Sequence, residues 1–245
     1  QNRKTLLLIT IPFCILEIPF PRMEQLARIL YSPIIYLQRK VAFKTLHPNL
    51  NEKSDVADAF VSEVQITAQL DHPNIVPVYN LEHVEHSPAY TMKLVQGQTL
   101  KSFIQKAKHN FDKKQPIPED CTLNSLLDYF LNVCDAVHFA HTRGIIHRDL
   151  KPDNIMIGPY RDVYLMDWGI ARPVAEKFSE ECVVLSQQQW PSEAGKIIGT
   201  PRYMSPEQAG GKNEQLDARS DQFSLGCILF ELVTLKPAFT GKQLA

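Results

Sequence analysis

Eight consecutive residues, 147–154, constrain this chain more than any other stretch, and they read His-Arg-Asp-Leu-Lys-Pro-Asp-Asn. A short apolar run follows at residues 163–166 and ends in Asp167-Trp168-Gly169. The sequence therefore brings two carboxylates, a lysine and an amide close together, on predicted loops around a buried strand. Such groups can hold a metal-bound phosphate chain over an acceptor hydroxyl, so the pattern indicates phosphoryl transfer.

A single charged residue after a helix usually lies in a solvated turn, and each of these residues alone would be interpreted in that way. Eight matching positions, followed by a strand that ends in an acid, favour a functional interpretation instead. In this combination the sequence resembles the catalytic loop and the magnesium loop of protein kinases. The resemblance covers roughly residues 39–240 and is closest to eukaryotic-like serine/threonine protein kinases of the bacterial branch.

The resemblance implies a role for each charged group of this stretch. Asp149 would be the base that accepts or orients the proton of the acceptor hydroxyl, and Lys151 would contact the γ-phosphate of ATP. Asn154 and Asp167 would hold Mg²⁺, a hard cation that prefers carboxylate, amide and phosphate oxygens.

A lysine and a glutamate earlier in the chain complete the implied phosphate site. Residues 41–44 alternate apolar and polar, which predicts a half-buried strand, and they resemble the VAIK strand of the family with Phe43 replacing Ile. Apolar residues recur every four positions in residues 55–70, which predicts a helix. Glu63 on this helix could be an ordinary solvated residue, but the resemblance pairs it with Lys44 and so directs the ammonium at the α- and β-phosphates.

The resemblance also implies an adenine pocket between two lobes. Met92 would lie at its back, and Lys93 and Val95 would belong to the hinge, whose backbone groups can bond adenine. Ala42 would lie above the adenine ring and Met156 beneath it, although both are equally consistent with ordinary core residues.

Residues 199–207 carry a second strong resemblance. They read Gly-Thr-Pro-Arg-Tyr-Met-Ser-Pro-Glu, which resembles the GTPxYMAPE end of the activation segment in serine/threonine kinases. The preceding residues 178–196 are long and polar, so we expect a mobile segment. Arg148 could pair with a phosphorylated residue of this segment. The conceivable phosphorylation sites are Ser179, Ser186 and Ser192.

Three further expectations concern the support of the site. Residues 216–235 are predicted to form a buried helix with Ser220 as its cap. Asp221 on this helix resembles the aspartate that anchors the catalytic-loop backbone, and Trp168, which replaces the usual phenylalanine, is expected to pack beside His147. Because the family adds helices after this point, Glu207 is predicted to lack its usual arginine partner.

Residues 1–37 do not match the family, which places a glycine-rich hairpin over the ATP phosphates here. No glycine precedes Gly97. Either the hairpin is absent, or this segment is not the native partner of the rest of the chain. The predicted divisions are therefore an atypical segment at 1–37, the N-lobe at 38–96 and a shortened C-lobe at 97–245.

Composition bounds the class of protein. With 245 residues, 44% hydrophobic and 22% charged, the chain is typical of a soluble globular protein of one domain or two lobes. The net charge of −1 argues against nucleic acid as a partner. Five dispersed cysteines without a CxxC pair favour a reducing compartment, so we expect a cytoplasmic location.

One stretch, residues 6–20, invites a membrane interpretation. It is short for a span and is interrupted by Pro12, Glu17 and Pro19, so no clear membrane span is predicted. A weak signal peptide remains an alternative, and a strand or an atypical leader is favoured.

Together these patterns predict an α+β fold of two lobes, with a small antiparallel sheet in the N-lobe and a mainly helical C-lobe. The predicted function is a protein serine/threonine kinase that uses ATP and Mg²⁺ to phosphorylate protein substrates. An alternative from another class is an inactive or weakly active kinase-like fragment that serves at most as a nucleotide- or protein-binding module. A third is a small-molecule phosphotransferase of related fold, which the peptide-docking resemblance of residues 199–207 disfavours.

Overall fold

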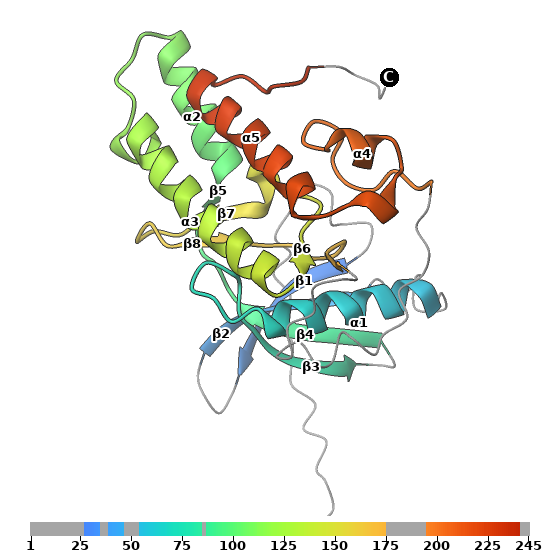
Figure 1. The fold of residues 1–245 in the computed structure, drawn as a ribbon. Helices are drawn as coiled ribbons and strands as arrows, with labels where there is room; N and C mark the ends of the chain where they lie inside the picture. The colour runs from blue at the N-terminus through green and yellow to red at the C-terminus, as the bar shows by residue number, and fades with distance from the viewer. Residues whose placement is uncertain (1–26, 35–38, 47–53, 85–86, 175–194, 241–245) are drawn as a thin grey trace, which may run out of the picture.

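The N-lobe is a four-stranded antiparallel sheet with one helix beside it (Figure 1). The computed structural model describes residues 27–34, 39–46, 54–84, 87–174 and 195–240. The strands are β1 (Ala27–Ile34), β2 (Arg39–Leu46), β3 (Val78–Val84) and β4 (Ser87–Lys93), in the order β1-β2-β4-β3. Helix α1 (Ser54–Gln69) packs apolar side chains against β4, where Phe60 and Val64 join Tyr90 and Met92 in one buried cluster.

The structure changes two details of the expected N-lobe. Strand β1 lies within residues 1–37 and pairs along the whole of β2, so an antiparallel strand pair exists there without glycine. The half-buried expectation for residues 41–44 is wrong, because β2 lies between β1 and β4 and the side chains of these four residues are all buried. In addition, Ile75, which precedes β3, forms an isolated parallel bridge with Leu165 of the C-lobe.

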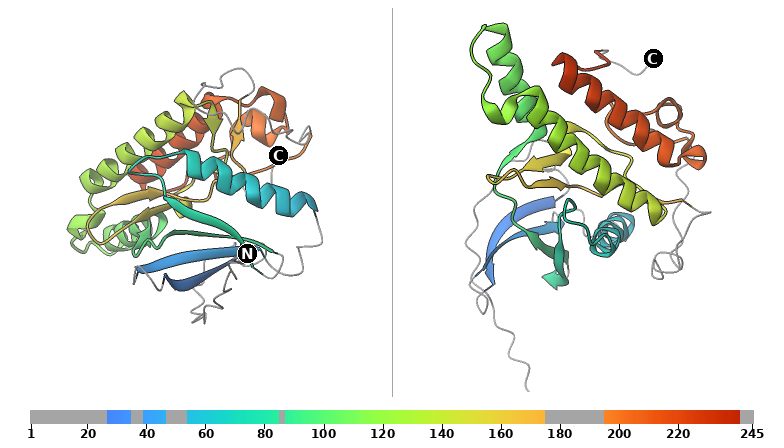
Figure 2. Two further views of the ribbon diagram at one scale, coloured as in Figure 1. Left: turned by 90° about the horizontal axis from the view of Figure 1, so that it is seen from below. Right: turned by 60° about the vertical axis from the view of Figure 1, so that its left-hand side comes forward.

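The C-lobe is mainly helical, as predicted, and its helices frame two small sheets (Figures 1 and 2). The helices are α2 (Leu100–Asp112), α3 (Leu123–Thr142), α4 (Pro206–Ala209) and α5 (Ala218–Thr234), with 3₁₀ turns at Glu119–Cys121, Pro152–Asn154 and Asn213–Gln215. The strands are β5 (Gln98–Thr99), β6 (Ile145–Ile146), β7 (Ile155–Ile157), β8 (Val163–Leu165) and β9 (Arg172–Pro173).

The ends of the C-lobe helices have identifiable causes. Thr122 begins α3 because its side chain accepts a hydrogen bond from the backbone N–H of Ser125. Gly144 follows α3 with φ +73°, a conformation that favours glycine. The cap of α5 is Asp217, so the prediction of Ser220 is wrong: Asp217 accepts from the backbone N–H of Arg219, whereas Ser220 lies inside the helix.

The larger of the two apolar cores lies in the C-lobe, where α2, α3 and α5 bury side chains with the β7–β8 hairpin. Leu165 and Trp168 belong to this core and lie on either side of Asp167, so packing fixes the backbone that carries the acid. Among the described helices, none is long and apolar enough to cross a membrane. The stretch at residues 6–20 lies outside the described residues.

Candidate active site

The β7–β8 hairpin brings the two predicted magnesium ligands to one end of a small sheet. Asn154 immediately precedes β7 and Asp167 follows β8 by two residues. The backbone N–H of Met166 donates to the carbonyl of Asn154 at 2.8 Å, which closes this end of the hairpin. Asp167 has φ +60°, a left-handed conformation that an aspartate adopts at some cost in strain.

Helix α5 anchors the catalytic loop through one side chain. Asp221 accepts the backbone N–H of His147 at 2.8 Å and that of Arg148 at 2.9 Å, one with each carboxylate oxygen. The prediction that Asp221 anchors this loop is therefore confirmed. Two further contacts were not predicted. His141 lies 2.8 Å from the same carboxylate, and Gln208 donates its side-chain amide to the carbonyl of Arg148 at 2.8 Å.

Four side chains converge at the catalytic loop, and we call them the aspartate cluster: Asp149, Lys151, Asn154 and Thr200. The Asp149 carboxylate accepts a hydrogen bond from the Lys151 ammonium. The side-chain amide of Asn154 donates to the backbone carbonyl of Asp149 at 3.0 Å. The Thr200 hydroxyl donates to Asp149 Oδ1 at 2.6 Å and accepts from Lys151 Nζ at 3.0 Å. Sequence reasoning missed Thr200, although its position in the 199–207 motif was a usable signal.

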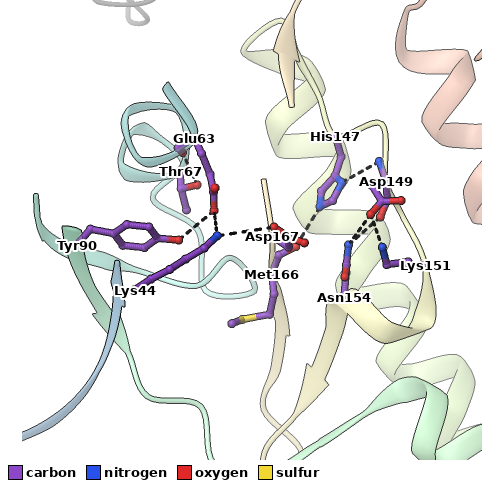
Figure 3. A network of polar contacts seen from close by, with 10 residues as sticks. All are labelled: Lys44, Glu63, Thr67, Tyr90, His147, Asp149, Lys151, Asn154, Met166 and Asp167. Carbon is purple, nitrogen blue, oxygen red and sulfur yellow. Dashed lines mark hydrogen bonds and ion pairs between the residues drawn. The ribbon is translucent and has the colours of Figure 1, made fainter. Parts of the chain in front are cut away.

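Three side chains form a second group in the N-lobe, the lysine cluster: Lys44, Glu63 and Tyr90. Lys44 Nζ donates to Glu63 Oε1 at 2.6 Å, and the Tyr90 hydroxyl donates to the same oxygen at 3.0 Å (Figure 3). Burial lowers the pKa of Lys44, but the negative charge of Glu63 and further contributions from Tyr90 and Asp167 raise that pKa well above its ordinary value. The raised pKa favours the charged ammonium.

One ion pair joins the two lobes at the candidate site. Lys44 Nζ lies 4.0 Å from Asp167 Oδ1 (Figure 3), so the lysine cluster reaches the magnesium loop of the C-lobe. From Asp167, the backbone bond between Met166 and Asn154 leads to the aspartate cluster. Lys44 thus meets Asp167 across the lobes, and Met166, the residue before Asp167, bonds the backbone of Asn154, whose side chain donates to Asp149.

Trp168 packs against His147, as predicted, with ring centroids 4.6 Å apart. The His147 ring in turn spans the site, because Nε2 lies 3.2 Å from the Met166 carbonyl and Nδ1 accepts the backbone N–H of Asp149 at 3.3 Å. The indole N–H of Trp168 is buried and has no hydrogen-bond partner among the described residues.

The residues assigned to adenine lie on both lobes. Ala42 and Met92 are direct partners across β2 and β4, and both are buried. Val95 is partly buried against the same N-lobe cluster, whereas Met156 is buried on β7 of the C-lobe. The Lys93 ammonium donates to the Tyr164 hydroxyl of β8 and lies 4.3 Å from its ring centroid, so the hinge side chain is held against the C-lobe.

Two predictions concern the activation segment. Glu207, predicted to lack an arginine partner, accepts a hydrogen bond from the Ser220 hydroxyl at 2.6 Å. Burial alone would raise the pKa of Glu207, but the hydrogen bonds from Ser220, from its own backbone N–H and from Ser205 lower that pKa overall. The Arg148 guanidinium donates to Asn213 at 3.2 Å. The candidate phosphorylation sites and most of the segment expected to be mobile lie outside the described residues.

The donor set at Asn154 and Asp167 fits a magnesium ion. Asn154 uses its amide NH₂ to donate to Asp149, which leaves the amide oxygen as the atom able to bind a cation. The Asp167 side chain is 27% exposed and therefore open to a ligand. Mg²⁺ commonly takes one or two protein oxygens and completes its shell with phosphate and water. Within the described ranges, no three His, Cys, Asp or Glu side chains gather into a group that could hold a metal ion by themselves.

Comparison with known proteins agrees with this geometry. Residues 35–245 match the family model of the protein kinase domain. Serine/threonine-protein kinase PknD of Protochlamydia amoebophila (strain UWE25) is 36% identical over 208 residues, which are 82% of this chain and 21% of that protein. PknB of Mycobacterium leprae, also named a serine/threonine-protein kinase, is 38% identical over 211 residues, which are 84% of this chain and 30% of that protein.

A third relative, PknD of Chlamydia pneumoniae, is 33% identical over 220 residues, which are 87% of this chain and 23% of that protein. This chain therefore spans less than a third of the length of these relatives. The family match, in contrast, covers most of the chain. The chain belongs to the protein kinase domain family, and the relatives it resembles are bacterial serine/threonine kinases.

Proposed function

We propose that this domain is a serine/threonine protein kinase that transfers the γ-phosphoryl group of ATP to hydroxyls of protein substrates. The observation that carries the proposal is that Lys44 lies 4.0 Å from Asp167, whose neighbour Met166 bonds the backbone of Asn154 beside Asp149. It joins a group suited to phosphate with a group suited to a hydroxyl proton. Phosphoryl transfer depends on that positioning and on charge neutralisation more than on covalent help.

The lysine cluster would bind the nucleotide. Glu63 holds the flexible stem of Lys44, so the ammonium points toward the α- and β-phosphates without having to be ordered on binding. Ala42, Met92 and Met156 would contact adenine through apolar surface, and the backbone of Lys93 and Val95 would bond its edge.

The aspartate cluster would carry out the transfer. Asp149 orients the acceptor hydroxyl and receives its proton, and Lys151 neutralises charge on the transferred group. Thr200 already bonds both residues, so it fixes the distance between base and ammonium. Asn154 and Asp167 would hold Mg²⁺, which when bound neutralises charge on the phosphates.

The proposed setting is a reducing compartment such as the bacterial cytoplasm. Cys121, Cys134 and Cys227 are free thiols, which supports that proposal. The identity of residues 199–207 supports a protein acceptor over a small alcohol, because these residues resemble a peptide-docking segment.

Label transfer from γ-labelled Mg-ATP to casein, followed by phosphoamino-acid analysis, tests the proposal. We expect phosphoserine or phosphothreonine, and we expect Asp149→Ala to abolish transfer while leaving ATP binding intact. Binding of ATP by the unaltered chain without any transfer would instead support a binding module, an outcome that the lack of glycine before Gly97 makes worth testing. Transfer to small alcohols in preference to casein would support a small-molecule phosphotransferase.

A further inference from the structure

Tyr90 is the member of the lysine cluster to which the proposed mechanism gives no role. It lies on β4 directly across from Lys44 of β2, and its side chain is buried. Its hydroxyl donates to Glu63 Oε1, the same oxygen that accepts the Lys44 ammonium (Figure 3). One carboxylate oxygen is thus fixed from two directions, by a strand tyrosine and by a strand lysine.

The surroundings of Tyr90 ensure that its hydroxyl acts as a donor. Burial raises its pKa, and the nearby Glu63 carboxylate raises that pKa further, so the phenol keeps its proton. The tyrosine ring also faces the ammonium, because Lys44 Nζ lies 5.6 Å from the ring centroid. Tyr90 therefore contacts both members of the ion pair while carrying no charge of its own.

Lys44 lies between two carboxylates, and its position depends on which of them holds it. Glu63 is 2.6 Å away and Asp167 is 4.0 Å away. A glutamate held only by a flexible lysine has rotational freedom, since an ammonium is a point charge that follows its partner. A mobile Glu63 would let the ammonium move toward Asp167 and away from the phosphates it is meant to meet.

We propose that Tyr90 is a positioning residue, whose hydroxyl locks the Glu63 carboxylate and so keeps Lys44 directed at the phosphates of the nucleotide. This inference rests on the proposed function and adds a residue to it. The competing interpretation is that Tyr90 only fills space. It packs against Phe60 with ring centroids 5.4 Å apart, and a phenylalanine would fill the same volume.

The test is Tyr90→Phe, with Tyr129→Phe as a matched control. Tyr129 is equally buried, but its hydroxyl has no hydrogen-bond partner among the described residues. Calorimetric titration with Mg-ATP and with adenosine separates phosphate contacts from adenine contacts. We expect Tyr90→Phe to weaken ATP binding about 3- to 10-fold and to leave adenosine binding unchanged, whereas Tyr129→Phe changes neither. In kinetics the KM for ATP rises by the same factor, and kcat stays within about twofold.

Three outcomes would count against the inference. Unchanged ATP affinity in Tyr90→Phe would leave the residue a space filler. Equal losses for ATP and adenosine would indicate general disturbance of the lobe. Failure of the unaltered chain to bind ATP would overturn the proposed function itself, and this inference with it, so the two failures are distinguishable.

A double-mutant cycle tests the route through Glu63. If Tyr90 acts on Lys44 only by fixing Glu63, Tyr90→Phe has no further effect on ATP affinity once Glu63→Ala is present. Losses that simply add would mean that Tyr90 affects the nucleotide by another path, and the proposed role would be wrong.

Discussion

The lysine cluster and the aspartate cluster each pair a lysine with a carboxylate, yet the two are built differently. Lys44 and Glu63 lie between a central strand and a helix, with side chains 5% and 8% exposed. Lys151 and Asp149 lie on a loop, with side chains 15% and 12% exposed. The first pair is enclosed by secondary structure, whereas the second is bonded by the side-chain amide of Asn154 and the hydroxyl of Thr200.

This difference suits the lysine cluster to nucleotide binding and the aspartate cluster to phosphoryl transfer. A buried ion pair is rigid, but removing one partner leaves an uncompensated charge and destabilises the fold. A partly exposed pair is less important for stability and can exchange partners during a reaction. We therefore expect the lysine cluster to affect stability and nucleotide binding together, and the aspartate cluster to affect turnover with little change in stability.

Matched lysine substitutions test this comparison most strongly. Lys44→Met leaves Glu63 buried without its cation, so we expect a loss of about 3 to 5 kcal/mol in the free energy of unfolding. Lys151→Met, at the more exposed pair, is expected to cost no more than about 1 kcal/mol. Urea denaturation followed by circular dichroism measures both values. Equal losses in the two variants would show that the clusters do not differ as burial indicates.

Asp221 anchors the backbone that precedes Asp149, and its substitution is expected to give the next largest loss of stability. Asp221→Asn keeps one acceptor but places an amide NH₂ against a backbone N–H, and we expect a loss of about 2 to 3 kcal/mol in the free energy of unfolding. The control is Asp217→Asn at the cap of the same helix, where asparagine caps as well as aspartate and the expected change is under about 0.5 kcal/mol. Tolerance of Asp221→Asn would mean that the loop is held chiefly by other contacts.

The sequence predicted those parts of the site that follow from local pattern. The apolar periodicity of residues 55–70 and 216–235 located α1 and α5. The linear motifs singled out Lys44, Glu63, Asp149, Asn154 and Asp167. In the fold, Lys44 contacts Glu63 and Asp167, and Asn154 contacts Asp149.

Contacts between residues distant in sequence could not be read from pattern. Tyr90 and Thr200 each join a cluster through a hydroxyl. The partner of Tyr90 is 27 residues away and that of Thr200 is 51 residues away, and the residue type alone predicts neither contact. The contact between His141 and Asp221 likewise spans 80 residues. Burial of β2 on both faces likewise depends on strand order, which alternation in sequence does not specify.

Thr200 allows a finer test of the aspartate cluster, at the level of turnover. Thr200→Val keeps the shape of the side chain but removes the hydroxyl that joins Asp149 and Lys151. We expect kcat to fall about tenfold, equivalent to about 1.4 kcal/mol, with ATP affinity unchanged. Thr200→Ser restores the hydroxyl and should restore most of the rate. A loss of ATP affinity in Thr200→Val would contradict the division between binding and chemistry.

The smallest expected effect concerns the junction between the lobes, which we define as the contacts of Asn74 with strand β8. Asn74, in the loop before β3, accepts the backbone N–H of Leu165 at 2.7 Å and donates its side-chain amide to the carbonyl of Val163 at 3.0 Å. Its own backbone N–H donates to Nδ1 of His72 at 3.1 Å. The neutral imidazole therefore supports a loop that ties the N-lobe to β8.

Protonation of His72 should weaken this junction. Burial lowers the pKa of His72 below 6.5, with Asp135 opposing the shift and Arg143 adding to it. The folded state then binds fewer protons than the unfolded state below pH 6.5, so this contribution to stability is present above that pH and is lost as the pH falls. We expect the free energy of unfolding to drop by under about 1 kcal/mol between pH 7.5 and 5.5, because the ring is partly solvated. His72→Gln should flatten this pH dependence, whereas the control His109→Gln, at an exposed position on α2, should leave it unchanged. If the unaltered protein and both variants show the same change in the free energy of unfolding with pH, groups other than His72 cause it.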